Sequence, residues 1–188
     1  MYLSKISLRS LPASVHRLVM RGFPSTEHDS PRAKWGILYR VEPSGVVLVQ
    51  SAIEPDWSAV APPESVSIRL LSPKINIGQV YAFRIAINPV VVQRGRRVPV
   101  PVEDWLAKRD LGAELDIAHV DYSRITDTSG DGHRVTLSVA RVEGVLKVAD
   151  TGRLQEVLTK GVGKSRAYGC GMLSIAPTLS TPKLPKTL

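Results

Sequence analysis

The feature that most constrains the fold is a series of short amphipathic segments that comes twice in the same order. In the first half, Tyr2, Ser4, Ile6 and Leu8 alternate along the chain, a period that predicts a β-strand. Prolines confine residues 54–64 to at most one helical turn. The expected elements are a strand at residues 2–8, a helix at 12–22, a loop at 24–34, a hairpin of strands at 36–42 and 46–52, and a strand at 66–71.

The second half follows the same order with a basic hairpin added. Tyr81, Phe83 and Ile85 alternate and predict its first strand. Asp150 is expected to cap the last helix, because an aspartate side chain accepts the free N–H groups of a first turn. The expected elements are a strand at 80–88, a hairpin at 89–101 with Gly95 at its tip, a helix at 102–111, a loop and then a strand in 114–124, a polar loop at 126–132, a hairpin of strands at 135–142 and 145–148 turning at Glu143-Gly144, a helix at 150–160 and a strand at 172–176.

This repeated order predicts the fold class. Strand, helix, strand, strand, helix, strand is the order of the ferredoxin-like domain, with the second helix reduced to a turn in the first half. We expect an α+β protein of two tandem ferredoxin-like (βαββαβ, RRM-like) domains at residues 1–76 and 77–177, followed by a flexible tail at 178–188. Aromatic residues make up only 5% of the chain, so base stacking across a sheet is not expected.

A glycine-rich stretch at residues 161–173 has two possible interpretations. It is either a helix C-cap with a tight turn or a loop that cradles a phosphate, since it also carries Lys164 and Arg166 and no acid. Gly163-Lys164-Ser165 looks like the end of a Walker loop, but that pattern needs a glycine at Leu158 and a helix afterwards. A dinucleotide fingerprint would need a glycine at Arg166. A mononucleotide site is therefore not expected.

The positive charge of the chain is concentrated in three segments without acids. The net charge is +8, and the segments at residues 1–26, 88–102 and 157–171 together carry ten cations. If these segments converge in space, they form an electrostatic footprint for nucleic acid. Arg94, Arg96 and Arg97 are then phosphate-contacting residues, or else a solvated hairpin tip.

Among the histidines, His16 has the context that suits catalysis. It lies at the edge of the apolar stripe of the first expected helix, close to Arg17 and Arg21. It is either a bystander or a general acid/base whose neighbouring cations stabilise a pentacovalent phosphate. His28 and His133 fall in expected loops, and His119 has no catalytic context.

Neither a metal site nor a cofactor site is expected. The single cysteine, Cys170, excludes an internal disulfide and a cysteine-based zinc site, and is expected to be a packed residue. Glu103-Asp104 suit a helix start, while Asp127 and Asp131 suit a turn. No signal peptide and no run long enough to span a membrane is expected, so a cytoplasmic protein is the default.

Several stretches along residues 1–177 resemble the CasE-type CRISPR-associated endoribonucleases, in the same order. The glycine-rich stretch is the most specific of them. The similar stretches are residues 1–5 (Met-Tyr-Leu-Ser-Lys), 83–89 (Phe-Arg-Ile-Ala-Ile-Asn-Pro), 130–132 (Gly-Asp-Gly), 142–146 (Val-Glu-Gly-Val-Leu) with Asp150, and 161–173.

The resemblance implies two ferredoxin-like domains and a metal-independent endoribonuclease of the type I-E Cascade system. Such an enzyme cleaves precursor CRISPR RNA at the 3′ side of a repeat stem-loop. The upstream 2′-hydroxyl attacks the scissile phosphate and leaves a 2′,3′-cyclic phosphate or 3′-phosphate and a 5′-hydroxyl. The resemblance also implies that the enzyme retains the mature CRISPR RNA and assembles with other Cascade subunits.

The family's site residues can be placed by position in this sequence. Its catalytic histidine falls on His16, its tyrosine one turn earlier falls on Ala13, and its lysine in the glycine loop falls on Arg166. We therefore expect His16 to be the general acid/base. The alternative is a non-catalytic subunit that binds an RNA hairpin. The expected RNA-binding residues are Arg17, Arg21, Arg94, Arg96, Arg97, Lys160, Lys164, Ser165 and Arg166.

Overall fold

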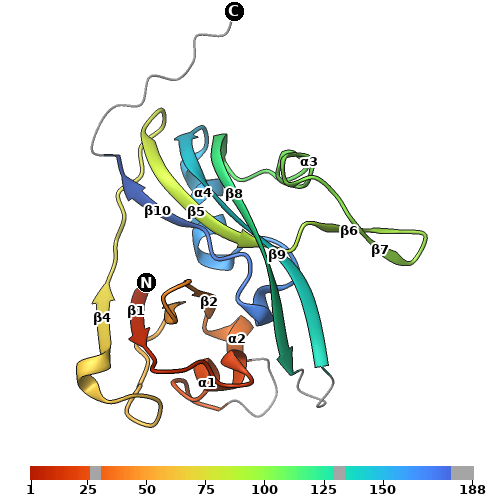
Figure 1. Ribbon diagram of the computed structural model, residues 1–188. Coiled ribbons are helices and arrows are strands. Elements are labelled where there is room, and N and C mark those ends of the chain that lie inside the picture. The colour runs from red at the N-terminus through yellow and green to blue at the C-terminus, as the bar shows by residue number, and fades with distance from the viewer. Residues whose placement is uncertain (26–30, 129–133, 179–188) are drawn as a thin grey trace, which may run out of the picture.

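The first sheet is formed by the N-terminal part of the chain. The computed structural model describes residues 1–25, 31–128 and 134–178. Strands β1 (Tyr2–Ser7), β2 (Leu38–Val41), β3 (Val46–Ser51) and β4 (Val66–Leu70) form an antiparallel sheet in the order β2-β3-β1-β4 (Figure 1). The short helix α1 (Val15–Met20) packs on it through Val19, against Ile6 and Val47. Since β1 lies between the third and fourth strands, this is the ferredoxin-like order that the sequence predicts.

The second sheet repeats this topology. Strands β5 (Val80–Ile87), β8 (Ala113–Thr128), β9 (Arg134–Val148) and β10 (Ser174–Pro177) are arranged in the order β10-β5-β9-β8, so its first strand again lies between the third and the fourth. Helices α3 (Val102–Ala107) and α4 (Thr151–Lys160) cover one face, where Trp105 and Leu154 pack against Phe83. The α+β fold of two ferredoxin-like units is confirmed. Residues 71–79 connect the sheets and contain the predicted domain boundary at 76/77.

A two-stranded hairpin extends from the second unit. It consists of β6 (Val90–Gln93) and β7 (Arg96–Pro99), and it projects from the body of the molecule (Figure 1). Its turn is Arg94-Gly95, with φ of 48° and 76°. Positive φ at both turn residues matches the twist of a tight hairpin, and an arginine in that conformation is uncommon. The expected hairpin with Gly95 at its tip is confirmed.

The long strands β8 and β9 correct two expectations. The predicted hairpin at Glu143-Gly144 is wrong, because β9 runs straight through both residues and pairs with β8 along its length. A Cβ on Gly144 would lie 2.0 Å from the carbonyl oxygen of Asp116, so this glycine allows a close approach of β8 rather than a turn. The expected loop before the strand in 114–124 is also wrong: β8 is continuous, with a register shift between Ile117 and His119.

The remaining differences concern helix ends and loops. The first helix begins after Ser14, whose side chain accepts a hydrogen bond from the N–H of Arg17, and is shorter than expected. Part of the expected loop at 24–34 is a helical turn, α2 (Pro31–Lys34), and a 3₁₀ turn lies at Pro63–Ser65. Of the polar loop at 126–132, the first three residues belong to β8 and the others lie outside the described residues, as does the tail beyond residue 178.

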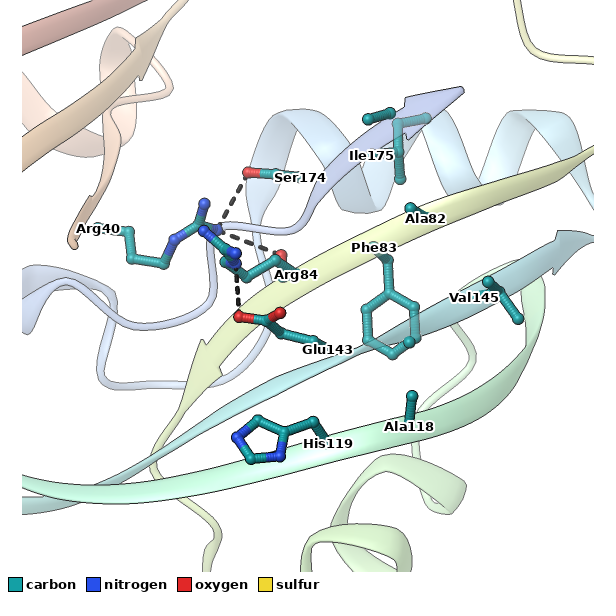
Figure 2. Close-up of a pocket in the computed structure, with 12 residues that line it drawn as sticks. Arg40, Ala82, Phe83, Arg84, Ala118, His119, Glu143, Val145, Ser174 and Ile175 are labelled. Carbon is teal, nitrogen blue, oxygen red and sulfur yellow. Dashed lines mark hydrogen bonds and ion pairs between the residues drawn. The ribbon is translucent and has the colours of Figure 1, made fainter. Parts of the chain in front are cut away.

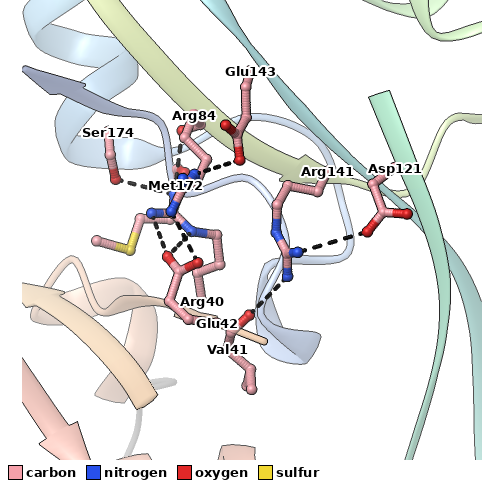
Figure 3. Close-up of polar contacts among 9 residues, drawn as sticks. All are labelled: Arg40, Val41, Glu42, Arg84, Asp121, Arg141, Glu143, Met172 and Ser174. Atoms are coloured by element: carbon pink, nitrogen blue, oxygen red, sulfur yellow. Dashed lines mark hydrogen bonds and ion pairs between the residues drawn. The ribbon is translucent and has the colours of Figure 1, made fainter. Parts of the chain in front are cut away.

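The two units are joined by a buried arginine. Arg40 of β2 is 2% exposed, and its Nη1 donates to the carbonyl oxygens of Arg84 and Met172, both at 3.2 Å, and to the hydroxyl of Ser174 (Figure 3). Glu42 lies 2.9 Å from Arg40 Nη2 and 3.2 Å from Arg84 Nη1. Because Arg40 belongs to the first sheet and its carbonyl partners to the second unit, the contact fixes one unit against the other.

Candidate functional site

His16 lies where the first helix meets the second unit. It is the second residue of α1, and its ring centroid lies 6.5 Å from that of Tyr39 on β2, with the planes tilted by 31°. Its Nδ1 is buried and has no hydrogen-bond partner among the described residues. The 3₁₀ turn η2 (Arg166–Tyr168) of the glycine-rich stretch contacts both α1 and β2. His16 is therefore a junction residue rather than a surface one.

Three influences act on the protonation of His16. Burial lowers its pKa below the ordinary value of 6.5, the carboxylate of Asp127 raises it, and the guanidinium of Arg32 lowers it. The net direction is downward, so the neutral imidazole is favoured near neutral pH. A neutral imidazole can accept a proton from a hydroxyl, as a general base must.

Tyr39 is held in a fixed position next to His16. It is 1% exposed, and its hydroxyl donates a hydrogen bond of 2.7 Å to the carbonyl oxygen of Ala167. Burial raises the pKa of Tyr39, and Asp127 raises it further. The phenol therefore stays neutral at physiological pH and connects β2 to the glycine-rich stretch.

The first glycine of the stretch at residues 161–173 serves helix capping and domain contact. Gly161 is the C-cap of α4, with φ of 71°, and its N–H donates to the carbonyl oxygen of Val157. A Cβ at this position would lie 2.8 Å from Leu38 Cδ2 of the first sheet. The structure thus favours the interpretation of a helix cap and tight turn at Gly161.

The cations near this stretch lie in a pocket between the units. Arg32 of α2, Lys160 of α4 and Arg166 of η2 line a cavity of about 240 Å³ that has no acidic residue in its wall. Arg166 Nη1 donates to the carbonyl oxygen of Lys160 at 2.7 Å, while its Nε is buried without a partner among the described residues. Burial, and after it the charge of Arg166, lowers the pKa of Arg32. Two arginines are therefore held close together with their charges uncompensated in that wall, an arrangement that suits an anion.

The other predicted RNA-binding residues are distributed around this junction. Arg17 of α1 and Arg21, the C-cap residue of this helix, are exposed and line a groove with Ala13, and Arg21 donates to the carbonyl oxygen of Ala59. Lys164 is exposed, and the hydroxyl of Ser165 accepts a hydrogen bond from Asn88 at the base of the β6–β7 hairpin. Lys160 Nζ pairs with Glu156 at 2.9 Å.

The three basic segments converge only in part. The segment with α1 and the glycine-rich stretch are in contact, since η2 touches α1. The third segment joins them at its base through Asn88 and Ser165. Its arginines, Arg94, Arg96 and Arg97, are exposed on the projecting hairpin, apart from α1 (Figure 1).

Sequence reasoning missed two residues at the junction, Asp127 and Arg32. Asp127 was expected in a turn, but it belongs to β8 and is 5% exposed. Arg32 was expected in a loop and lies on α2. Nothing in the local sequence marks either residue: Arg32 comes near His16 through the folding of the first unit, and Asp127 through the packing of the second unit on the first.

A larger cavity lies elsewhere, on the open face of the second sheet. It has a volume of about 490 Å³ and is lined by residues of β5, β8, β9 and β10, with Arg40 at one side (Figure 2). Arg84 and Glu143 pair there at 2.8 Å, and His119 lies at its edge. None of the predicted site residues lines this cavity, so we place the candidate site at the junction.

Cys170 is 2% exposed, and burial raises the pKa of its thiol to about 12, so it is a packed residue as expected. Within residues 1–25, 31–128 and 134–178, no three His, Cys, Asp or Glu side chains lie close enough together to hold a metal ion. None of the helices in these ranges is long and apolar enough to cross a membrane.

The fold and the site define a class of protein: two ferredoxin-like units with a histidine and several cations where they meet. Comparison with known proteins gives the family. The family model described as CRISPR associated protein matches residues 1–177. The Cascade subunit CasE of Escherichia coli K12 is 30% identical over 202 residues, which covers 94% of this chain and all of the relative. The chain belongs to the CRISPR-associated protein family and is of the CasE type.

Two further similarities agree with this assignment. The CRISPR-associated endoribonuclease Cse3 of Thermus thermophilus is 31% identical over 173 residues, which covers 75% of this chain and 80% of the relative. A solved structure of Cse3 bound to a 19-nucleotide RNA superposes with a TM-score of 0.74 at 26% identity, covering 94% of this chain and 99% of the other.

Proposed function

We propose that this protein is a CRISPR endoribonuclease that binds the repeat stem-loop of precursor CRISPR RNA and cleaves it at the 3′ side of the stem. The observation that carries the proposal is that α1, which holds His16, contacts η2, whose Arg166 lines a cation-lined pocket where the two ferredoxin-like units meet, in a chain of the CasE type. A relative is named an endoribonuclease and another a Cascade subunit. The protein accordingly retains its product RNA and joins the other Cascade subunits.

In the proposed mechanism, His16 exchanges a proton with the reacting RNA. The 2′-hydroxyl upstream of the cut loses its proton as it attacks the phosphorus, and the leaving 5′-oxygen gains one. A cyclic 2′,3′-phosphate, or the 3′-phosphate derived from it, and a 5′-hydroxyl result. His16 is poised for the first of these transfers, because burial favours its neutral form.

Cations would stabilise the extra negative charge of the pentacovalent phosphate. Arg32 and Arg166 supply two guanidinium groups from opposite units. Arg17, Arg21, Lys160, Lys164 and Ser165 surround the same junction and are proposed to hold the RNA backbone. Ala13, which precedes the N-cap of α1, stands where the family's tyrosine is expected, so no tyrosine at that position takes part in the chemistry.

The projecting hairpin is proposed to contact the RNA stem. Arg94, Arg96 and Arg97 are exposed on it, and the hairpin projects away from α1, the helix that holds His16 (Figure 1). Exposed arginines on such a projection can contact the phosphates of a stem. We propose domains at residues 1–76 and 77–177, with the RNA lying across both.

The decisive experiment is cleavage of a cognate repeat hairpin by His16→Ala. The variant should lose activity by about 10²-fold or more while it still binds the RNA. His119→Ala is the matched control, because His119 is exposed at the edge of the other cavity. Equal rates for His16→Ala and wild type would refute the catalytic role. RNA binding by wild type without cleavage would favour the non-catalytic subunit.

Two chemical tests follow from the mechanism. A 2′-deoxy nucleotide just upstream of the cut should abolish cleavage, since it removes the nucleophile. Chelation with EDTA should leave the rate unchanged, and strong inhibition would indicate a metal-dependent nuclease instead.

A further inference from the structure

A buried carboxylate of the second unit acts on residues of the first. Asp127 lies near the end of β8, opposite Val135 of β9, and is 5% exposed. Val135 and Tyr168 of η2 pack against the same buried cluster, and η2 contacts the helix α1 that carries His16, so this end of β8 lies near the histidine. In agreement with this position, the carboxylate of Asp127 favours a higher pKa of His16 and of Tyr39. Burying a carboxylate is costly unless its charge is compensated by neighbours, so this position calls for a specific role.

His16 offers the group that such a carboxylate can serve. Its Nδ1 is buried without a hydrogen-bond partner among the described residues, although buried polar atoms are nearly always paired. Tyr39 of β2 lies next to the ring, Arg32 of α2 lowers the pKa of the imidazole, and η2, with Arg166 and Tyr168, contacts α1. None of these is an acid. Within the part of the chain that the structure describes, Asp127 is the acidic group that acts on His16.

We infer that Asp127 is a positioning residue for His16: its carboxylate accepts the Nδ1–H of the imidazole and leaves Nε2 to exchange the proton with the RNA. The inference rests on the proposed function, because it assigns the tautomer of the proposed general acid/base. A carboxylate on one ring nitrogen fixes both the tautomer and the orientation of the ring. Hydrogen bonds of this kind are often long in the free enzyme and tighten when the substrate is bound.

The pair of His16 and Asp127 is therefore formed across the junction of the two units. His16 comes from the first unit and Asp127 from the second, so neither unit alone holds the pair. Arg32 opposes Asp127, because its charge disfavours the imidazolium that the carboxylate favours. Asp127 and Arg32 therefore shift the pKa of His16 in opposite directions.

The first test is an NMR titration of the His16 ring in the free, full-length protein. Asp127→Asn should shift the pKa of His16 downward, and Arg32→Gln should shift it upward. Asp121→Asn is the matched control, since Asp121 lies on the same strand, faces Arg141 and should leave His16 unchanged. An unaltered His16 titration in Asp127→Asn would overturn the inference. This readout does not depend on RNA cleavage.

The second test is single-turnover cleavage of the repeat hairpin across the pH range. Asp127→Asn should slow cleavage roughly 10-fold or more and move the His16-dependent limb of the profile to lower pH, with RNA affinity within about twofold of wild type. Asp127→Glu, which keeps the charge, should restore part of the rate. A parallel loss of affinity and rate with an unmoved profile would indicate a merely structural role and would refute the inference.

A third measurement needs no variant and covers the case in which Asp127→Asn does not fold. Nitrogen chemical shifts of His16 in wild type, bound to a repeat RNA with a 2′-deoxy block, report the tautomer directly. A proton on Nδ1 is expected, and a proton on Nε2 alone would overturn the inference. Failure of the proposed function is recognised separately, by cleavage at the wild-type rate in His16→Ala.

Discussion

The hydroxyl of Tyr39 donates a hydrogen bond of 2.7 Å to the carbonyl oxygen of Ala167, which ties the first sheet to the glycine-rich stretch beside His16. This contact spans the two units, and it fixes the position of the ring that lies next to the candidate catalytic histidine. The site therefore depends on interactions between distant parts of the chain.

Replacing Tyr39 by phenylalanine removes this bond and leaves the carbonyl oxygen of Ala167 without that donor. We expect a loss of about 1 to 2 kcal/mol in the free energy of unfolding, measured by urea denaturation. Tyr122→Phe is the control, because Tyr122 is 65% exposed on β8. A variant as stable as wild type would mean that the bond does not contribute.

Replacing Arg40 by methionine breaks the buried contact between the units. Glu42 loses its buried partner and keeps only the more exposed Arg84, and three acceptors of the second unit lose their donor. Removing one member of a buried ion pair typically costs about 3 to 5 kcal/mol, and we expect a destabilisation of that size in urea unfolding. Arg124→Met, at an exposed position on β8, should change stability by less than about 0.5 kcal/mol.

Replacing Gly144 by alanine places a Cβ against the backbone of Asp116, at a nominal 2.0 Å from its carbonyl oxygen. The strands must separate, so we expect a loss of about 3 kcal/mol or more. Gly152→Ala should do the opposite: Gly152 lies in α4 with its nearest neighbour at 3.5 Å, and alanine should stabilise that helix by up to about 1 kcal/mol. Thermal unfolding of the two variants shows whether each is less or more stable than wild type.

Replacing Arg97 by alanine tests the hairpin as a contact for the RNA stem. Each lost phosphate contact should weaken binding and reduce the slope of log K against log salt by roughly 1. The measurement is RNA binding over a salt series. Arg69→Ala removes an equally exposed cation from β4 of the first sheet, and its slope should match wild type. Identical slopes for Arg97→Ala and wild type would contradict the proposed contact.

The lowered pKa of His16 predicts a pH dependence of stability. Since the folded-state pKa lies below the ordinary 6.5, the unfolded chain binds the proton more readily. Stability is therefore lost as the pH falls through about 6.5, and His16→Ala should lose less stability than wild type between about pH 8 and pH 5. Urea unfolding over this range measures the free energy of unfolding of both proteins, and an equal loss in wild type and His16→Ala would contradict the prediction.

Much of the fold could be predicted from the sequence because strands and helices bury one face. Alternation at Ile6, Phe83 and Ile85 identified the strands, and Asp150 identified the start of the helix α4. Prediction failed at Gly144, because a glycine is expected both in a turn and where two backbones approach closely. Only the pairing of β9 with β8 decides between them.

The sequence by itself determined the two ferredoxin-like units, the family and the choice of His16, since each depends on local patterns or on ordered motifs. The tertiary structure decided what surrounds His16. Asp127 is 111 positions away along the chain and comes near it only through the length of β8 and the packing of one unit on the other. Local pattern carries no information about such a neighbour, because only long-range packing brings the carboxylate near the imidazole.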